Sequence, residues 1–368
     1  MGLSCGIVGL PNVGKSTLFN CLTQAGAQAA NYPFCTIEPN VGMVDVPDKR
    51  LVDLQDIIHS EKVIPAVMSF VDIAGLVKGA SQGEGLGNKF LAHIRETDAI
   101  LHLVRCFEDP NIVHVDGKVN PVRDVETIEA ELILADLDSV EKAKTRVQKR
   151  SKSQPKESKM ALDMLEGLFS HLDKAQPARS FEFNQGEAQL VELYQEMHLL
   201  SAKKQILVAN VDEATLSGEA NVHFDNLVAF ANKRGDKVVK VCANIEEELA
   251  ALSPDERKEY LESMGWTESG LERVIRMAFD TLGLMTYLTA GPKELRAWTI
   301  KKGFKAPQAA GVIHSDFERG FIKAEVMWWE DLVRLKSEKA CREAGLLRLE
   351  GKDYVVKDGD VMHFKFNV

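Results

Sequence analysis

The stretch Gly9-Leu10-Pro11-Asn12-Val13-Gly14-Lys15-Ser16, followed by Thr17, decides the fold of this chain. It fits the phosphate-binding pattern G-x-x-x-x-G-K-[ST] at every fixed position. The apolar residues at 5–8 predict a buried strand before it, and the spacing of Leu18, Phe19 and Leu22 predicts a helix after it. In such a strand–loop–helix, the loop N–H groups and the positive end of the helix dipole face phosphate oxygens. The stretch therefore predicts a nucleotide-binding site.

Each member of this loop has an expected task. Nucleotide contacts are expected from Asn12, Val13, Gly14, Lys15, Ser16 and Thr17. The Lys15 ammonium would reach the outer phosphates and is therefore a catalytic candidate as well. The Ser16 hydroxyl would hold Mg²⁺, which is the expected cofactor.

Composition limits the class of protein. A chain of 368 residues with 45% hydrophobic and 27% charged residues is typical of a globular protein with two or three domains. The net charge of −10 argues against a chain that coats nucleic acid over its whole surface, so any RNA contact must be local. No apolar run could span a bilayer, and the six cysteines include no C-x-x-C pair. We therefore expect a cytoplasmic protein with reduced thiols and no membrane partner.

A loop and a strand end supply further metal and phosphate candidates. Two prolines and an asparagine predict a loop over residues 31–39, where Thr36 is placed to complete a Mg²⁺ shell when the γ-phosphate is present. A buried strand predicted at 66–71 ends at Asp72, the expected second metal-side carboxylate. The backbone N–H of Gly75 can meet the γ-phosphate. The predicted metal ligands are thus Ser16, Thr36 and Asp72.

Hydrolysis lacks its usual residue in this sequence. Leu76 stands where Ras-like GTPases have the glutamine that orients the attacking water, and leucine has no polar group for that task. The glycine-rich residues 75–87 predict a mobile switch. His114, in the polar stretch 105–118, could orient or deprotonate water, but a loop histidine is more often solvated surface.

The base pocket departs from that of guanine-specific proteins. Their N-K-x-D motif is matched here by Asn210, but Val211 replaces the lysine and Glu213 replaces the aspartate. Because unpaired buried polar groups are costly, a changed pocket changes base preference strongly. We expect ATP to be preferred over GTP. Asp212 is a second acid that could line the pocket.

Two further regions follow from hydrophobic periodicity. Apolar stripes at helical spacing between 128 and 172 predict an antiparallel helical hairpin, or coiled coil, whose tip at 142–159 is strongly basic. Such a run is usually a solvated helix end, but in an acidic protein it also suits RNA or ribosome contact. From about 283, short alternating strands predict a small α+β domain.

The chain resembles the Obg-like ATPase family, called YchF in bacteria, over nearly all of its length. The resemblance is carried by residues 9–17, 31–40, 72–76 with the following glycines, 105–107, 210–213 and 311–316. It implies a translation-factor-class P-loop ATPase associated with ribosomes, as the large subunit or 70S particle, and a C-terminal ubiquitin-like TGS domain. It also implies that the family's proposed catalytic histidine falls on His114.

The predicted fold is therefore α/β, with a P-loop NTPase domain at 1–123 and 203–282, an inserted helical hairpin at 124–202 and a TGS domain at 283–368. The predicted function is that of a Mg²⁺-dependent ATPase that switches conformation and binds the ribosome or RNA–protein partners. Two alternatives stay open. One is a GTPase with an atypical base pocket, and the other is a nucleotide-binding RNA or ribosome scaffold with negligible hydrolysis.

Overall fold

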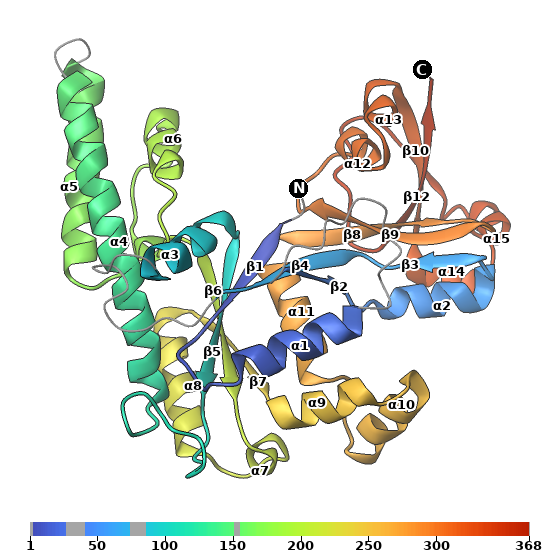
Figure 1. The fold of residues 1–368 in the computed structure, drawn as a ribbon. Helices are drawn as coiled ribbons and strands as arrows, with labels where there is room; N and C mark the ends of the chain where they lie inside the picture. Colours follow the sequence, from blue (N-terminus) through green and yellow to red (C-terminus); the bar gives the residue numbers. More distant parts are fainter. Residues whose placement is uncertain (1–2, 27–40, 74–85, 151–154, 368) are drawn as a thin grey trace. The chain divides into compact units, whose positions relative to one another are not determined.

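A computed structural model of the protein describes residues 3–26, 41–73, 86–150 and 155–367 (Figure 1). These residues form two compact units. The described part of the first unit comprises residues 3–26, 41–42, 69–73, 86–150 and 155–274, and that of the second comprises 43–68 and 275–367. The hairpin falls in the first unit, and the three-domain division of the sequence stays a prediction.

Most of a six-stranded sheet of order β2-β4-β1-β5-β6-β7 lies in the first unit. Its strands are β1 (Ser4–Val8), β2 (Val41–Asp45), β4 (Val67–Asp72), β5 (Ala99–Arg105), β6 (Lys204–Asn210) and β7 (Lys237–Val241). β1 pairs in parallel with β4 and β5, and β6 pairs in parallel with β5 and β7. This is the α/β architecture expected from the sequence.

The central strands read as continuous apolar runs because both faces of the sheet are covered. Every residue of β5 is buried, and so is every residue of β6 after Lys204. The register aligns Arg105 with Asn210, and Ile7 with Asp72. Since the carboxyl ends of parallel strands meet at one edge, Asp72, Arg105 and Asn210 all stand at the edge where open α/β sheets bind ligands.

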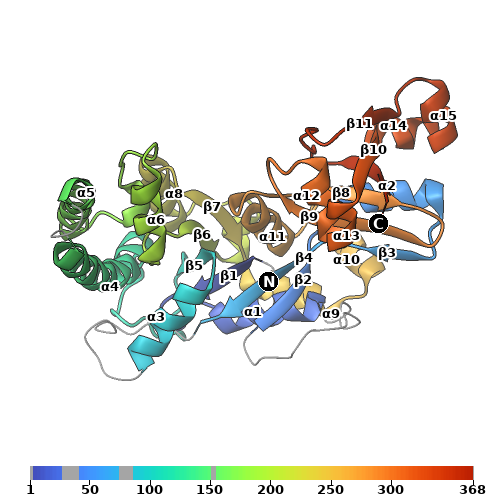
Figure 2. The same ribbon diagram turned by 90° about the horizontal axis from the view of Figure 1, so that it is seen from above.

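Helices cover both faces of this sheet (Figures 1 and 2). The helices in this part of the chain are α1 (Lys15–Gly26), α3 (Leu86–Glu96), α4 (Pro121–Arg150), α5 (Pro155–Asp173), α6 (Ala188–Glu196), α7 (Glu213–Leu216), α8 (Val222–Arg234), α9 (Ala243–Ala251), α10 (Pro254–Ser263) and α11 (Gly270–Thr281), with a 3₁₀ turn at Ala178–Ser180. Of these, α5 packs on α4 and α6. α1 packs on β1 and α9, while α4 packs on β5 and α8.

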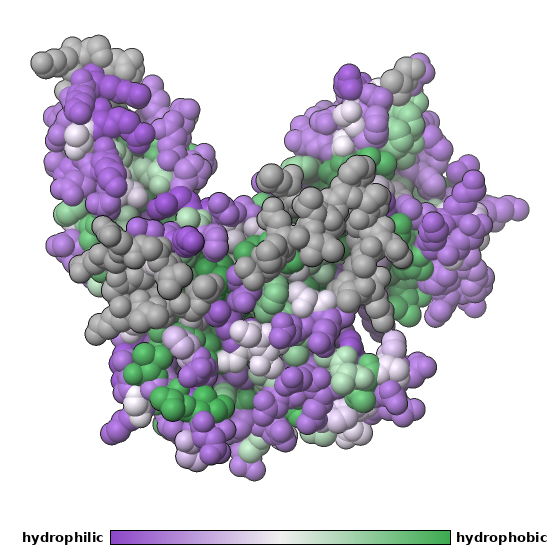
Figure 3. All heavy atoms as spheres, in the orientation of Figure 1, coloured by the Kyte–Doolittle hydropathy of each residue, from purple (hydrophilic) through white to green (hydrophobic). Residues whose placement is uncertain are grey.

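The predicted hairpin is confirmed as α4 and α5, which run side by side (Figure 1). Its seam is apolar, with Val140, Ala143, Leu165 and Leu168 almost wholly buried at helical spacing. The described part of the hairpin farthest from the sheet presents a largely hydrophilic surface in Figure 3. A hydrophilic end is what the run of lysines and arginines in the sequence predicts.

An ionic cluster ties α4 to α8 and to the 3₁₀ turn at Ala178–Ser180. The Glu129 carboxylate, 6% exposed, accepts hydrogen bonds from the guanidinium groups of Arg179 and Arg234. Burial acts to raise the pKa of Glu129, but the hydrogen bonds and charges of the two arginines outweigh it, so the pKa lies below its usual value. His102 of β5 lies beside this cluster and is fully buried, and burial lowers its pKa to about 4.

The second unit contains a mixed sheet of order β11-β10-β12-β8-β9-β3. Its elements are α2 (Lys49–Ile58), β3 (Lys62–Ile64), β8 (Leu284–Ala290), β9 (Glu294–Lys301), α12 (Ala306–Ile313), α13 (Ser315–Arg319), β10 (Phe321–Trp328), α14 (Trp329–Leu335), α15 (Glu338–Glu343), β11 (Arg348–Glu350) and β12 (Asp360–Phe366). The small α+β domain expected after residue 283 is therefore present, and its identity as a TGS domain stays a prediction.

Helix α12 packs on β9 and β10, where the alanines of one face make room for aromatic side chains of the sheet. The Tyr287 hydroxyl is buried there and donates to the Ala309 carbonyl over 2.9 Å. The sequence pattern missed β3, which pairs in parallel with β9 more than two hundred residues later. It also missed α2, which packs on β9 and α14.

The cysteines in the described ranges are Cys5, Cys21, Cys106, Cys242 and Cys341, and all are buried and unpaired. This agrees with the expectation of reduced thiols. Across residues 3–26, 41–73, 86–150 and 155–367, no helix is both long enough and apolar enough to cross a membrane.

Candidate nucleotide site

The P-loop, residues 9–16, connects β1 to α1 and adopts a backbone that few residues tolerate. Gly14 has φ 92° and Asn12 has φ 61°, both in the left-handed region. A Cβ on Gly9 would lie 2.7 Å from the Leu103 carbonyl oxygen, so only glycine fits between β1 and β5 at that point. The fixed glycines of the motif are thus explained by backbone geometry.

Lys15 begins α1 and reaches across to the end of β4. Its ammonium lies 3.2 Å from Asp72 Oδ1, and both side chains are partly exposed. The structure therefore brings together the two charged residues that the sequence assigned to phosphate and metal. Ser16 follows on the first turn of α1 and is exposed. A hydroxyl and a carboxylate are oxygen donors of the kind that Mg²⁺ prefers, so the residues present fit this cation.

Asn210, at the end of β6, ties the P-loop to the start of α9. Its Nδ2 donates to the Val13 carbonyl over 3.0 Å, and its Oδ1 accepts from the Ala243 N–H over 3.0 Å. The side chain is almost wholly buried. A Cβ on Gly14 would lie 2.6 Å from Asn210 Nδ2, so the absence of a side chain at Gly14 leaves room for the amide. The amide therefore holds the P-loop in shape, in addition to any contact that it makes with the nucleotide base.

The three residues after Asn210 separate into different environments. The Val211 side chain packs in a buried apolar cluster, and its backbone N–H donates to the Val241 carbonyl over 2.8 Å, so the side chain cannot meet a nucleotide. Asp212 caps α7, because its Oδ1 accepts from the Thr215 N–H over 2.8 Å. Glu213 begins α7 and is exposed. Of the two acids, Glu213 thus has the side chain that is left available for a base.

The loop between β5 and α4, residues 106–120, is called the His114 loop below. It is organised by Arg105, whose guanidinium is buried and donates to the carbonyls of Phe107, Asp109 and Ile112 over 3.0, 3.2 and 2.9 Å. A buried guanidinium that donates to three backbone carbonyls fixes the conformation of the loop that carries them. Pattern reasoning missed this role, and a charged residue at the end of a largely apolar strand was the signal for it.

His114 itself is buried, with 8% of its surface exposed, so the expectation of a solvated loop histidine was wrong. Its Nδ1 accepts the Asp116 N–H over 3.2 Å, and its Nε2 lies 2.9 Å from Asp124 Oδ2. Because Nδ1 accepts, the ring proton belongs on Nε2, which donates to the carboxylate. Both ring nitrogens are therefore occupied.

Three predicted positions fall outside the described residues: Thr36, Gly75 and Leu76. The residues that the structure brings to one end of the sheet are the P-loop, Asp72, Asn210 and the His114 loop. The last of these touches the P-loop directly, since Asn12 Nδ2 donates to the Val113 carbonyl over 3.1 Å.

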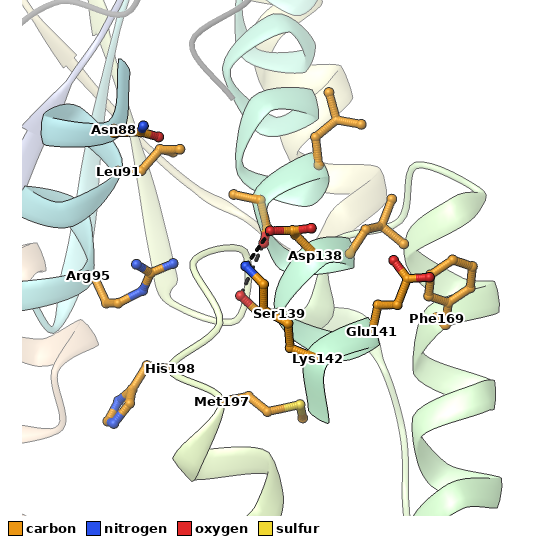
Figure 4. A pocket seen from close by; sticks show the side chains of 13 residues that line it. Asn88, Leu91, Arg95, Asp138, Ser139, Glu141, Lys142, Phe169, Met197 and His198 are labelled. Atoms are coloured by element: carbon orange, nitrogen blue, oxygen red, sulfur yellow. Dashed lines mark hydrogen bonds and ion pairs between the residues drawn. The ribbon is translucent and has the colours of Figure 1, made fainter. Parts of the chain in front are cut away.

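A separate groove of about 740 Å³ lies between α3, α4 and α5 (Figure 4). Its lining mixes cations and acids, among them Arg95, Asp138, Lys142 and His198. Lys142 is paired with Asp138 over 2.7 Å. No P-loop residue lines it, so this groove is not the nucleotide site.

Two family models match the chain. Residues 4–136 match the model described as "50S ribosome-binding GTPase", and residues 284–367 match YchF-GTPase_C, a "Protein of unknown function". The chain is 55% identical over 368 residues, and over the full length of both chains, to the "Ribosome-binding ATPase YchF" of Pasteurella multocida. It belongs to the YchF family. The protein of the same name from Bacillus subtilis is 54% identical over 371 residues, again across both full lengths.

A solved structure supports the family fold over the whole chain. The Schizosaccharomyces pombe structure named "YchF GTPase" superimposes with a TM-score of 0.88 at 38% identity, covering 99% of this chain and 98% of that one. The YchF-family fold therefore includes the P-loop unit, the hairpin and the C-terminal unit. The printed names differ on the nucleotide, ATPase for the bacterial relatives and GTPase for the yeast structure.

Proposed function

We propose that this chain is an ATPase that hydrolyses ATP to ADP and phosphate and acts on the ribosome. The observation that carries the proposal is the full-length match, at 55% identity, to a protein named ribosome-binding ATPase. The P-loop geometry supplies the chemistry, because the loop and its lysine stand at the carboxyl end of a parallel sheet. A ribosome-bound ATPase would work in the cytoplasm.

Phosphate and metal contacts are assigned to the P-loop end of the sheet. The backbone N–H groups of residues 12–17 and the Lys15 ammonium would hold the phosphates. Ser16, Thr36 and Asp72 would hold Mg²⁺, which when bound neutralises charge on the phosphate oxygens. The Lys15–Asp72 ion pair of 3.2 Å supports this assignment, since it places the cation and the carboxylate on neighbouring positions. The Gly75 N–H is the remaining candidate for the γ-phosphate.

The base would be read by the segment after β6. Asn210 holds the loops that frame the pocket, the Val211 backbone follows it, and Glu213 offers a carboxylate one methylene longer than the aspartate of guanine-specific proteins. We infer that ATP is preferred over GTP. The second candidate is GTP hydrolysis, which the yeast structure's name and the matched GTPase model favour.

Water activation is assigned to His114, since Leu76 cannot perform it. The Asn12–Val113 hydrogen bond supports the assignment, because it holds the residue before His114 against the P-loop. The ring must first give up one of its two hydrogen bonds, since neither nitrogen is free to accept from water.

Ribosome contact is assigned to the basic end of the hairpin. Its described cations lie on the last turns of α4, which end with Lys149 and Arg150. RNA phosphates would attract these groups despite the net charge of −10 on the chain. The small C-terminal unit, as a TGS domain, would supply a further RNA or protein contact. We assign nucleotide binding to residues 1–123 with 203–282. We assign ribosome contact to the hairpin at 124–202 and the further contact to the TGS domain at 283–368.

Calorimetric titration with non-hydrolysable ATP and GTP analogues in Mg²⁺ tests the nucleotide assignment. We expect tighter binding of the ATP analogue, and tighter binding of the GTP analogue would put the GTPase first. Turnover should be lost in Lys15→Ala and on chelation of Mg²⁺, whereas Lys339→Ala, on an exposed helix of the second unit, should match the wild type. Negligible turnover of the wild type, even with ribosomes, would favour the scaffold.

A further inference from the structure

Several side chains attach the His114 loop to the rest of the first unit, and three of them act on the stretch that ends at His114. Arg105 holds the carbonyls of residues 107, 109 and 112, as described above. The Asn12 amide holds the Val113 carbonyl from the P-loop. Asp124, on the first turns of α4, holds His114. The first two contacts fix backbone, so they can persist while the third, a contact between two side chains, is broken and remade.

Asp124 is built for this contact. Its side chain is 2% exposed, and its Oδ2 accepts the Nε2–H of His114 over 2.9 Å. Its Oδ1 has no hydrogen-bond partner among the described residues, and the nearest cation, the Arg123 guanidinium, lies 3.6 Å away. Burial raises the pKa of Asp124, and the hydrogen bond from His114 opposes that rise. The imidazole is thus the main partner of a buried carboxylate.

We propose that Asp124 is a positioning residue that holds His114 away from reaction until the imidazole is released. Asp124 accepts the Nε2–H and holds the ring in the orientation in which the Asp116 N–H occupies Nδ1, so the bound ring has no lone pair for water. This inference rests on the proposed function of His114 and adds what restrains it. The expected result is slow hydrolysis by the isolated protein.

Release needs little movement of the backbone. The Val113 carbonyl stays on Asn12, so rotation about the His114 side chain suffices to bring the ring toward the P-loop side. Once Nδ1 is free, it accepts a proton from the attacking water. The water oxygen forms a bond to the γ-phosphorus as the bond to the β,γ-bridging oxygen breaks, and ADP leaves with that electron pair. The proton on Nδ1 then returns to solvent or phosphate.

The test compares turnover by five variants of the full chain without ribosomes. Asp124→Leu removes the acceptor, and we expect kcat to rise about tenfold with KM unchanged, since a hydrogen bond to a charged group is lost. Asp124→Asn keeps an oxygen acceptor without the charge and should give a smaller rise. His114→Ala and the double variant His114→Ala/Asp124→Leu should both be slow. Asp138→Asn, an exposed acid of the same helix, should match the wild type.

Nitrogen-15 NMR of the imidazole gives a second readout that a purely structural role would not move. The wild type should show a hydrogen-bonded Nε2–H and an accepting Nδ1 at His114, and Asp124→Leu should shift both nitrogen signals as the ring leaves that orientation. Should Asp124→Leu fail to fold, Asp124→Asn decides the question by the same two measurements. A slow His114→Ala with no rise in kcat in either Asp124 variant would overturn the inference. Wild-type turnover by His114→Ala would instead overturn the proposed role of His114.

Discussion

The substitution Asn210→Ala tests how the P-loop is held in shape. The alanine methyl cannot reach either partner of the amide, so the Val13 carbonyl and the Ala243 N–H both lose a buried hydrogen bond. Asn210 is 2% exposed, so water does not readily replace the amide. The loop would then lose the contact that fixes its backbone just before Gly14.

The magnitude follows from the two groups left unpaired. Each buried polar group without a partner costs about 1–3 kcal/mol, so the free energy of unfolding should fall by about 2–6 kcal/mol. Relaxation of the loop would lower that value toward the smaller figure. In the variant, nucleotide must order a P-loop that Asn210 no longer holds in shape, and this ordering costs binding free energy. Affinity for an ATP analogue should therefore fall at least about tenfold, which is about 1.4 kcal/mol.

Urea unfolding of the nucleotide-free protein and calorimetric titration of an ATP analogue measure the two effects. Asn221→Ala is the matched control, because Asn221 also spans two segments, donating to the Cys106 carbonyl and the Thr215 hydroxyl, but does not touch the P-loop. It should destabilise the fold and leave nucleotide affinity unchanged. If Asn210→Ala lost stability yet bound the analogue as tightly as the wild type, the bracing role would be refuted.

Three further outcomes are expected. Glu129→Gln should lower the free energy of unfolding in urea by about 3 kcal/mol, since it removes the charge between two partly buried arginines, and an unchanged value would contradict the role of that cluster. Burial lowers the pKa of His102 to about 4, so its contribution to stability is complete above pH 6.5 and is lost as the pH falls toward 4. Relative to His102→Asn, the wild type should therefore lose about 3 kcal/mol between pH 7 and pH 4, and parallel stability curves would count against this. Gly14→Ala should abolish binding of the ATP analogue in calorimetry, because the new Cβ would lie 2.6 Å from Asn210 Nδ2 at a φ of 92°, and retained affinity would show that the loop adapts.

Local patterns were enough to predict the strands and helices that carry the site. The runs ending at Val8, Asp72 and Asn210 are apolar because the parallel sheet is covered on both faces, so their ends could be located by composition alone. The hairpin followed from its 3.6-residue period. In the second unit, β3 has only three residues and begins with an exposed lysine, and its pairing with β9 could not be read locally.

The sequence could not predict the environment of a side chain whose partner is set by tertiary contacts. His114 was expected to be solvated because nothing in its neighbourhood marks burial, while its partner Asp124 lies beyond a turn on the next helix. Asp212 could not be told from Glu213 until the start of α7 assigned it to a cap. Val211 is apolar because it belongs to the core as well as to the motif.

The 30 residues of α4 form one continuous helix, and a rigid turn of this helix about Glu129 would move its two ends by unequal amounts. At about 1.5 Å per residue, Arg150 at the far end lies about 31 Å along the axis from Glu129, where the two arginines clamp the helix. Asp124 lies about 7.5 Å from Glu129 along the axis in the opposite direction. A sideways push of about 4 Å at the hairpin end would therefore displace Asp124 by about 1 Å, enough to lengthen a 2.9 Å hydrogen bond beyond its working range. A ribosome bound at the distant end would thus break the contact between Asp124 and His114 by moving that end about four times as far as Asp124 itself moves.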